Sequence, residues 1–329
     1  MNPFDYQRAD NARAAVTTVA GRPGAMFLGA GTNLVDHMKL GVASPDLLVD
    51  VSRLPFDTIE APATGGVRIG ATVRNSDLAA EPVIRQRYPM VSAAVLAGAS
   101  GQLRNVATTA GNLLQRTRCV YFQDVTTPCN KRRPGTGCSA LDGYTRDHAI
   151  LGASRQCVAV HPSDLAVALT ALDAVVHVEG PGGPRDISIT EFYRLPGEYP
   201  HRDTVLEHGE LITAISLPEL PIAARSAYRK VRDRASYAFA LVSVAAAVRV
   251  EDGVVAEARV AFGGVAHKPW RATLAEQALR GAPASWRAFR EAADAELAEA
   301  RPLRDNGFKV PMARNTLVAT FRELTAEEG

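Results

Sequence analysis

The stretch that decides the fold is Met26-Phe27-Leu28-Gly29-Ala30-Gly31-Thr32-Asn33-Leu34, an apolar run that leads into a turn with two glycines. The pattern predicts a strand at Met26–Leu28, a short helix at Leu34–Lys39 and a second strand at Leu47–Val51. Successive backbone N–H groups of such a turn point into one concavity, and glycine lets a ligand approach closely. The turn is therefore a candidate pyrophosphate site, with an ordinary connecting turn as the alternative.

A second turn, Ala107-Thr108-Thr109-Ala110-Gly111-Asn112, again combines small residues, hydroxyl groups and glycine. Its hydroxyl and backbone donors suit phosphate oxygens. Asp50, at the end of the next predicted strand, would suit a nicotinamide-binding fold. Leu34 stands where that motif has its third glycine, so the support for such a fold is weak. Two such turns far apart in the chain suggest one elongated dinucleotide, such as FAD, held between two lobes.

Composition limits the class of protein. The chain has 329 residues, of which 47% are hydrophobic, so it exceeds the usual size of a single core and predicts two or three domains. A formal charge of +2, from 37 basic and 35 acidic residues, gives no support for binding to nucleic acid. The polar N-terminus predicts no signal peptide, and no apolar run reaches the roughly 18 residues of a membrane span.

The remaining pattern predicts an α+β protein. A strand at Val67–Ala71 precedes helices at 75–87, with Asn75 and Ser76 as caps, and at 91–99, and a helix at 164–174 leads into a strand at 175–178. Beyond Pro218 an antiparallel sheet is expected at 228–231, 241–250 and 254–262, with a hairpin at Asp252-Gly253 and helices at 286–297 and 316–324. We divide the chain into lobes at 1–55 and 56–220 and a C-terminal domain at 221–329.

The four cysteines, Cys119, Cys129, Cys138 and Cys157, fall inside one window of 39 residues. The nine, eight and eighteen residues between them include no tight knuckle of the kind that structural zinc sites use. Four thiolates also hold iron–sulfur clusters, whose negative charge nearby cations offset. Five cations lie close to the first two cysteines in sequence: Arg116, Arg118, Lys131, Arg132 and Arg133. They would offset the charge of a cluster, or they belong to a solvated loop. A four-iron cluster, a zinc site, and disulfides or free thiols all stay open at this point.

Other residues give weaker signals. The seven histidines include no pair at metal-binding helical spacing, and no Gly-x-Ser-x-Gly motif supports hydrolysis. Tyr228, Tyr237 and Phe239 are expected in the core of the C-terminal sheet. Lys230, taken alone, is expected to be a solvated lysine on an edge strand.

Across essentially its whole length the chain resembles the FAD-binding subunits of the xanthine dehydrogenase, or molybdenum hydroxylase, family. The likeness is greatest to the flavin subunits of periplasmic aldehyde oxidoreductases. It implies a two-lobed FAD-binding region of the vanillyl-alcohol-oxidase (PCMH) type, followed by a C-terminal domain like that of CO dehydrogenase flavoproteins. It is carried by Phe27-Leu28-Gly29-Ala30-Gly31-Thr32-Asn33-Leu34, Gly101-Gln102-Leu103-Arg104-Asn105-Val106-Ala107-Thr108-Thr109-Ala110-Gly111-Asn112 and Lys230-Val231-Arg232-Asp233-Arg234-Ala235-Ser236-Tyr237-Ala238-Phe239-Ala240.

In ordinary members of this family a Ser-Asp pair soon follows the Gly-Asn turn, whereas here Ser163-Asp164 comes about fifty residues after Gly111-Asn112. The resemblance implies that the extra segment, at about 115–160, holds a [4Fe–4S] cluster on all four cysteines. It also implies non-covalent FAD, because no histidine matches the covalent attachment site of distant relatives.

The resemblance assigns roles to single residues around the FAD. Asp164 would bind the ribityl hydroxyls, Leu211 or Ile212 would pack near the flavin ring, and Lys230 would stabilise negative charge at its pyrimidine edge. The pyrophosphate would lie on Leu28, Gly29, Ala30, Gly31, Thr32, Asn33, Leu34, Thr108, Thr109, Gly111 and Asn112.

The implied function is electron transfer in a heteromeric molybdenum-dependent aldehyde oxidoreductase. Molybdopterin would be held by a large partner subunit and [2Fe–2S] clusters by a small one, while FAD in this chain would pass electrons to an external acceptor. The alternatives are a self-contained FAD-dependent oxidoreductase with a structural zinc loop, and a non-catalytic assembly scaffold. The resemblance implies a periplasmic complex, exported folded with a partner that bears the signal, and a cytoplasmic complex is the alternative.

Overall fold

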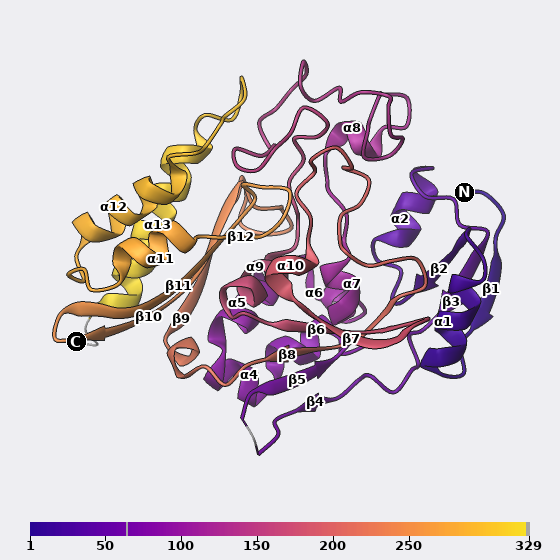
Figure 1. The fold of residues 1–329 in the computed structure, drawn as a ribbon, viewed down its shortest axis with the longest axis horizontal. Coiled ribbons are helices and arrows are strands. Elements are labelled where there is room, and N and C mark those ends of the chain that lie inside the picture. Colours follow the sequence, from indigo (N-terminus) through magenta and orange to yellow (C-terminus); the bar gives the residue numbers. More distant parts are fainter. Residues whose placement is uncertain (64, 327–329) are drawn as a thin grey trace.

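A computed structural model describes residues 1–63 and 65–326, and its strands form three sheets (Figure 1). The first sheet is parallel, in the order β1-β3-β2, with its strands at Asp5–Arg8 (β1), Ala25–Leu28 (β2) and Leu47–Asp50 (β3). Helix α1 (Ala12–Ala20) buries Ala15, Val16 and Val19 against it, and α2 (Leu34–Lys39) follows the first glycine turn. The strand–turn–helix–strand prediction is confirmed.

The middle sheet is antiparallel and has the order β4-β5-β8-β6-β7. Its strands are Ile59–Glu60 (β4), Val67–Gly70 (β5), Val175–Gly180 (β6), Gly183–Ser188 (β7) and Leu211–Leu217 (β8). The largest core lies on one face of this sheet, under helices that supply small and branched apolar side chains. These helices are α3 (Asn75–Ala80), α4 (Pro82–Arg87), α5 (Pro89–Ala97) and α9 (Asp164–Ala171), and shorter ones are α6 (Gly101–Arg104), α7 (Thr109–Leu113) and α10 (Ile189–Phe192).

The helix expected at 75–87 is two helices, so that prediction is wrong in this detail. Glu81 has φ −59° and ψ 122°, outside the helical region, and Pro82 begins the second helix. A proline disfavours helical backbone in the residue before it and is well suited to the first helical position. Asn75 is already inside the first helix, whose N-cap is Arg74.

The C-terminal sheet is antiparallel, as predicted, in the order β12-β11-β10-β9. Asp252 and Gly253 both have positive φ, at 50° and 76°, as a two-residue hairpin turn of the primed type requires. The strands are Ser226–Val231 (β9), Val242–Glu251 (β10), Val254–Gly263 (β11) and Trp270–Arg271 (β12), preceded by a 3₁₀ turn (η1) at Pro221–Ala224. The helices are α11 (Thr273–Leu279), α12 (Trp286–Leu297) and α13 (Lys309–Thr325).

Both faces of β10 are buried, which joins the C-terminal domain to the middle lobe. Val242, Val244 and Val248 belong to the core under α11–α13. Ala245 and Ala247 point the other way and belong to the core of the middle lobe, where α5 and α9 contact the sheet. Because alanine occupies the second face, helices of the middle lobe pack closely on it.

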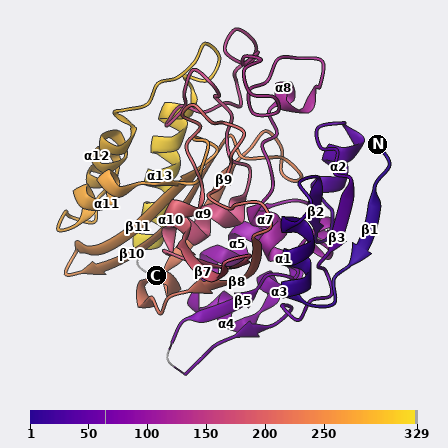
Figure 2. The ribbon, with the colours of Figure 1, turned by 45° about the vertical axis from the view of Figure 1, so that its right-hand side comes forward.

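The segment that contains the cysteines has one short helix, α8 (Val120–Gln123), and otherwise consists of loops. These loops lie together above the middle lobe, between α2 and the C-terminal helices, in both views (Figures 1 and 2). The segment leaves after α7 and returns at α9, where Ser163 Oγ donates to Asn112 Oδ1 at 2.7 Å. The Gly-Asn and Ser-Asp pairs, distant in sequence, are therefore neighbours in space.

Candidate cofactor site and cysteine cavity

The first glycine turn, residues 29–33, connects β2 to α2 and lines a cavity of about 230 Å³, here called the turn cavity. Gly31 has φ +74°, and a Cβ on it would lie 2.9 Å from Val35 Cγ2. Gly29 faces the second turn, because a Cβ on it would lie 3.3 Å from Thr108 Oγ1. Gly31 is thus needed for its backbone conformation, and Gly29 lies close to the second turn.

The second turn caps α7 through Thr108, whose Oγ1 accepts from Gly111 N at 3.2 Å. Thr109 is fully buried, and both its hydroxyl and its N–H donate to the Val73 carbonyl oxygen at 2.9 Å. With both donors used inside the protein, Thr109 has none left for a phosphate. The predicted contact of Thr109 with the pyrophosphate therefore finds no free donor on this residue.

A larger cavity, of about 740 Å³, continues from the turn cavity toward the C-terminal sheet. The two share Thr32, Asn33 and Gly111 as lining residues, so they form one elongated space between the lobes. Of the predicted residues, Leu28 and Thr109 line neither cavity. The turn cavity has Gly29, Ala30, Gly31, Thr32, Asn33, Leu34, Thr108, Gly111, Leu211 and Ile212, and the large cavity has Thr32, Asn33, Gly111, Asn112, Asp164 and Lys230.

Lys230 on β9 and Asp164 at the start of α9 form a buried ion pair in the wall of the large cavity. Lys230 Nζ lies 2.8 Å from Asp164 Oδ2, and the two side chains are 4% and 8% exposed. Tyr228 Oη donates to the other carboxylate oxygen at 2.5 Å, and burial together with the Asp164 charge raises the pKa of Tyr228 well above its ordinary value. The expectation of a solvated lysine is wrong, and a ligand in this cavity meets the lysine together with its carboxylate partner.

Tyr237 and Phe239 lie in the loop between β9 and β10 and line the same large cavity. They are 57% and 49% exposed, so the prediction that they belong to the sheet core is wrong, while Tyr228 does pack against the core. The Arg118 guanidinium lies over the Phe239 ring, 4.9 Å from its centroid. This loop therefore forms one aromatic wall of the cavity.

Leu211 and Ile212 begin β8 and line the turn cavity, whereas Lys230 lines the large cavity. The resemblance assigned these apolar residues and Lys230 to the same ring. The structure places them in adjoining parts of the elongated space, with Leu211 and Ile212 in the turn cavity and Lys230 in the large cavity.

All four cysteines line one small cavity, here called the cysteine cavity, together with Tyr121, Phe122 and Pro128. Cys129 and Cys138 are brought together by an antiparallel bridge between their backbones, and Cys157 is held by a bridge to Ser154. Cys129 and Cys157 are buried, the other two partly exposed, and none of the four is in a disulfide bond. A window of 39 residues thus folds so that its cysteines share one space.

The cysteine cavity does not have the geometry of a site for a single metal ion. Zinc needs its sulfur ligands about 2.3 Å from one point. Within residues 1–63 and 65–326 no three His, Cys, Asp or Glu side chains converge in that way. Burial raises the pKa of Cys119 to about 12 and that of Cys157 to about 11, so each thiol stays protonated at neutral pH unless a metal cation binds it.

A chain of charges connects the turn cavity to the cysteine cavity. Asp203 accepts from Arg116 Nε at 2.8 Å through one carboxylate oxygen and pairs with Lys131 Nζ through the other. Arg116 lines the turn cavity, and Lys131, whose side chain is 1% exposed, lines the cysteine cavity. For Lys131 the interpretation as part of a solvated loop is therefore wrong.

Replacing Asp203 with asparagine is expected to lower the free energy of unfolding by about 2 kcal/mol at pH 7, because a buried lysine loses its partner. Burial alone would raise the pKa of Asp203, but Lys131 and Arg116 outweigh it and hold that pKa well below its ordinary value. A carboxyl group with a depressed pKa in the folded state stabilises the folded protein at pH values above its unfolded pKa of about 3.9. This stabilisation is lost progressively as the pH falls below that value. The difference between wild type and Asp203→Asn, measured by urea unfolding, should therefore be largest near neutral pH and shrink below about pH 4. Exposed Asp142→Asn is the matched control, and equal pH dependence of all three proteins would contradict this role.

Replacing Gly31 with alanine is expected to weaken dinucleotide binding about thirtyfold. The added Cβ would lie 2.9 Å from Val35 Cγ2 at a φ of +74°, and strain of this kind costs about 2 kcal/mol. Flavin absorbance per chain after gel filtration measures the effect. Gly101→Ala is the control, because a Cβ there meets nothing within 4 Å, and full flavin content in Gly31→Ala would refute the assignment.

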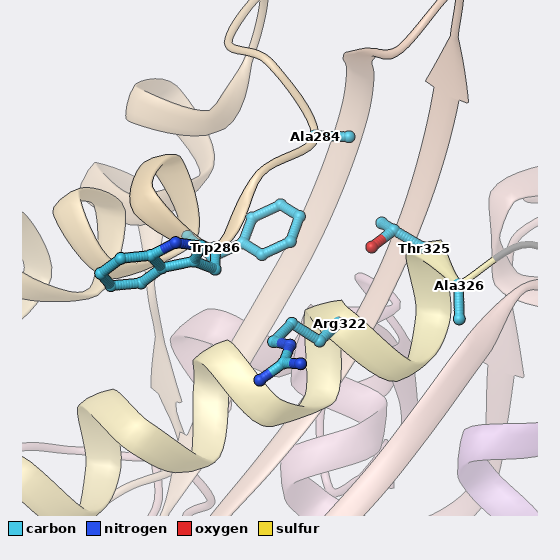
Figure 3. A pocket seen from close by; sticks show the side chains of 6 residues that line it. Ala284, Trp286, Arg322, Thr325 and Ala326 are labelled. Carbon is cyan, nitrogen blue, oxygen red and sulfur yellow. The ribbon is translucent and has the colours of Figure 1, made fainter.

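A separate hollow lies on the C-terminal domain between α12 and the end of α13 (Figure 3). It is lined by Ala284, Trp286, Phe289, Arg322, Thr325 and Ala326. None of the predicted site residues lines it, and its six residues include no carboxylate, thiol or imidazole.

Several residues of the site went unnoticed in the sequence. Asp203 and His148 belong to no recognisable motif. His148 lies against a cysteine, with Nε2 3.2 Å from Cys119 Sγ. The cysteine window, 119–157, includes His148 but not Asp203, so no signal in the sequence marks Asp203.

Comparison with known proteins agrees with this architecture. Residues 2–220 match the family model described as the FAD binding domain in molybdopterin dehydrogenase, and residues 226–324 match the CO dehydrogenase flavoprotein C-terminal domain. The aldehyde oxidoreductase FAD-binding subunit PaoB of Escherichia coli (strain K12) is 51% identical over 99% of this chain and 100% of its own length.

More distant relatives also match over most of their length. The glyceraldehyde dehydrogenase medium chain of Sulfolobus acidocaldarius is 27% identical over 84% of this chain and 81% of its own. A solved structure of carbon monoxide dehydrogenase from Hydrogenophaga pseudoflava superposes with a TM-score of 0.76 at 26% identity, covering 98% of this chain and 96% of that one. The chain therefore belongs to the FAD-binding subunits of the molybdenum hydroxylase family, which are flavin subunits of oxidoreductases of the aldehyde oxidoreductase and xanthine dehydrogenase type.

Proposed function

We propose that the chain is the FAD- and [4Fe–4S]-carrying electron-transfer subunit of a heteromeric molybdenum-dependent aldehyde oxidoreductase. The observation that carries the proposal is an elongated space between the lobes beside a separate cavity lined by four cysteines. The aldehyde class is supported by the 51% identical relative, which is an aldehyde oxidoreductase FAD-binding subunit.

The elongated space fits a dinucleotide with its pyrophosphate near the shared residues Thr32, Asn33 and Gly111. Backbone N–H groups of the 29–33 turn, with Thr108 Oγ1 and the Asn112 side chain nearby, would hold the phosphates. The Lys230–Asp164 pair would border the flavin ring in the large cavity, and the apolar Leu211 and Ile212 would line the part of the space on the other side of the turns. FAD bound there would take up electrons singly and release them in pairs.

The proposal of a cluster is supported by one observation, that all four cysteines line the same cavity. Cys119, Cys129, Cys138 and Cys157 would be the four ligands. Lys131 in the wall of the same cavity would offset part of the negative charge that four thiolates bring. A [4Fe–4S] cluster held in this way would supply one-electron redox chemistry.

The substrate chemistry is proposed to lie in partner subunits. Relatives are named as FAD-binding subunits and medium chains, which supports an assembly with larger and smaller chains. We propose a large molybdopterin-binding partner, a small [2Fe–2S] partner and an external electron acceptor. This chain would then hold both FAD and the four-iron cluster.

We also propose that the complex is periplasmic and is exported folded with a partner that bears the signal. No helix among the described residues is both long and apolar enough to cross a bilayer. Fractionation of cells that express the complete complex tests the location. Activity confined to the cytoplasm after export has been allowed to finish would contradict it.

The experiment that tests the function is anaerobic purification of the complex, followed by iron, zinc and flavin quantitation on this chain and EPR of the dithionite-reduced sample. We expect about four irons and one FAD per chain, with the spectrum of a reduced four-iron cluster. Zinc in place of iron, with turnover by the isolated chain, would instead favour a self-contained flavoenzyme. A stable complex that needs neither flavin nor iron would favour an assembly scaffold.

A further inference from the structure

A buried imidazole touches one of the cysteines. His148 Nε2 lies 3.2 Å from Cys119 Sγ, and the histidine is 4% exposed. Its other ring nitrogen, Nδ1, is buried and has no hydrogen-bond partner within the described part of the chain. Within the described part of the chain, the only hydrogen bond of the ring is therefore the one to the sulfur of Cys119.

This contact determines which ring nitrogen carries the proton when Cys119 is a metal ligand. A ligating thiolate has no proton to donate, so a hydrogen bond between the two groups needs Nε2 as the donor. Nε2 therefore carries a proton that points at the sulfur.

The position of His148 is set by the C-terminal domain rather than by the cysteine segment alone. Its carbonyl oxygen accepts from Lys309 Nζ at 3.0 Å and from Asn306 Nδ2 at 3.1 Å. Lys309 is fully buried at the start of α13 and also donates to the Gly264 carbonyl oxygen at 2.8 Å. Two side chains from one rigid helix start thus hold the backbone that carries the imidazole.

We propose that His148 is a positioning and tuning residue, which donates an Nε2–H···Sγ hydrogen bond to Cys119 and raises the reduction potential of the cluster. The inference depends on the proposed function, because it needs Cys119 as a cluster ligand. Reduction adds one electron to the cluster and increases the negative charge on its sulfurs, and a donor to sulfur stabilises that form. His148 also lines a cavity that reaches Asp164 and Phe239. The hydrogen bond would therefore act on the cluster ligand that lies toward the proposed flavin site.

The test is a potentiometric EPR titration of the four-iron signal in the purified complex. A hydrogen bond to a charged group is worth enough to shift an equilibrium about tenfold. We therefore expect His148→Phe to lower the equilibrium constant for cluster reduction about tenfold at unchanged iron content. His148→Gln, whose amide is also a donor, should restore most of it, and exposed His201→Phe should leave it unchanged.

A reduction equilibrium in His148→Phe equal to that of wild type would overturn the inference, as would a glutamine variant that shifts as far as phenylalanine. If the phenylalanine variant loses iron, a measurement on the wild-type complex still tests the proposed hydrogen bond. Pulsed EPR of its reduced cluster should show a coupled histidine nitrogen and an exchangeable deuteron, and absence of both would overturn the proposal. A wild-type complex with no four-iron signal at all would refute the proposed function instead.

Discussion

Replacing Cys138 with serine is expected to abolish the four-iron EPR signal of the complex and to remove most of the iron from this chain. Cys138 lines the cysteine cavity with the other three thiols, and its backbone is bridged to that of Cys129. A serine hydroxyl is a hard and weakly acidic ligand that does not replace a thiolate on iron. The cluster would thus lose one of its four attachments.

The measurement is iron per chain together with EPR of the reduced sample, with flavin absorbance as the internal reference. The flavin content should stay close to that of wild type, because the elongated space is lined by other residues. Ser139→Ala is the matched control: it changes the neighbouring residue of the same cavity and removes only a hydrogen bond to the Pro128 carbonyl oxygen. Full cluster content in Cys138→Ser would sink the assignment of the four ligands.

Replacing Lys230 with methionine is expected to lower the free energy of unfolding by about 3 to 5 kcal/mol and to deplete the flavin. The substitution leaves the Asp164 carboxylate, which is 8% exposed, without its cation. Tyr228 Oη remains as a donor to it, but a neutral hydroxyl does not balance a buried charge. Denaturant unfolding and flavin content per chain measure the two effects.

The double variant Asp164→Asn with Lys230→Met separates the two contributions. Removing both charges should recover much of the stability, because no unpaired ion is left, while flavin binding should stay weak if the pair contacts the ring. Lys39→Met, an exposed lysine at the end of α2, is the control for loss of a positive charge. Flavin content in the double variant equal to that of wild type would show that the pair is purely structural.

Local features were predictable because their causes lie in consecutive residues. The helices Leu34–Lys39 and Trp286–Leu297 occur with the predicted bounds. The Asp252-Gly253 hairpin follows from the tolerance of these residues for positive φ. Two helix predictions were wrong in their bounds. The helix expected at 75–87 was read through Pro82, and the one expected at 316–324 is only the second half of α13, which begins at Lys309.

The features of the site that differ from expectation have another origin, since each depends on residues that meet only after folding. Thr109 belongs to a phosphate-binding type of sequence, but its donors are taken by Val73, 36 residues away. Tyr237 and Phe239 have strand-forming side chains, yet they line a cavity from a loop because β9 ends at Val231. Lys230 looked like a surface lysine until Asp164, 66 residues away, was placed beside it.

The sequence by itself determined the glycine turn after its strand, the antiparallel C-terminal sheet and the grouping of four cysteines, because each depends on local backbone preference or on spacing. Only the tertiary structure decided that the cysteines share one cavity, that Asp203 connects it to the turn cavity, and that His148 faces Cys119. The physical reason is that burial and charge pairing are properties of the packed chain: a thiol, a lysine or an imidazole acquires its chemistry from neighbours that sequence distance does not reveal.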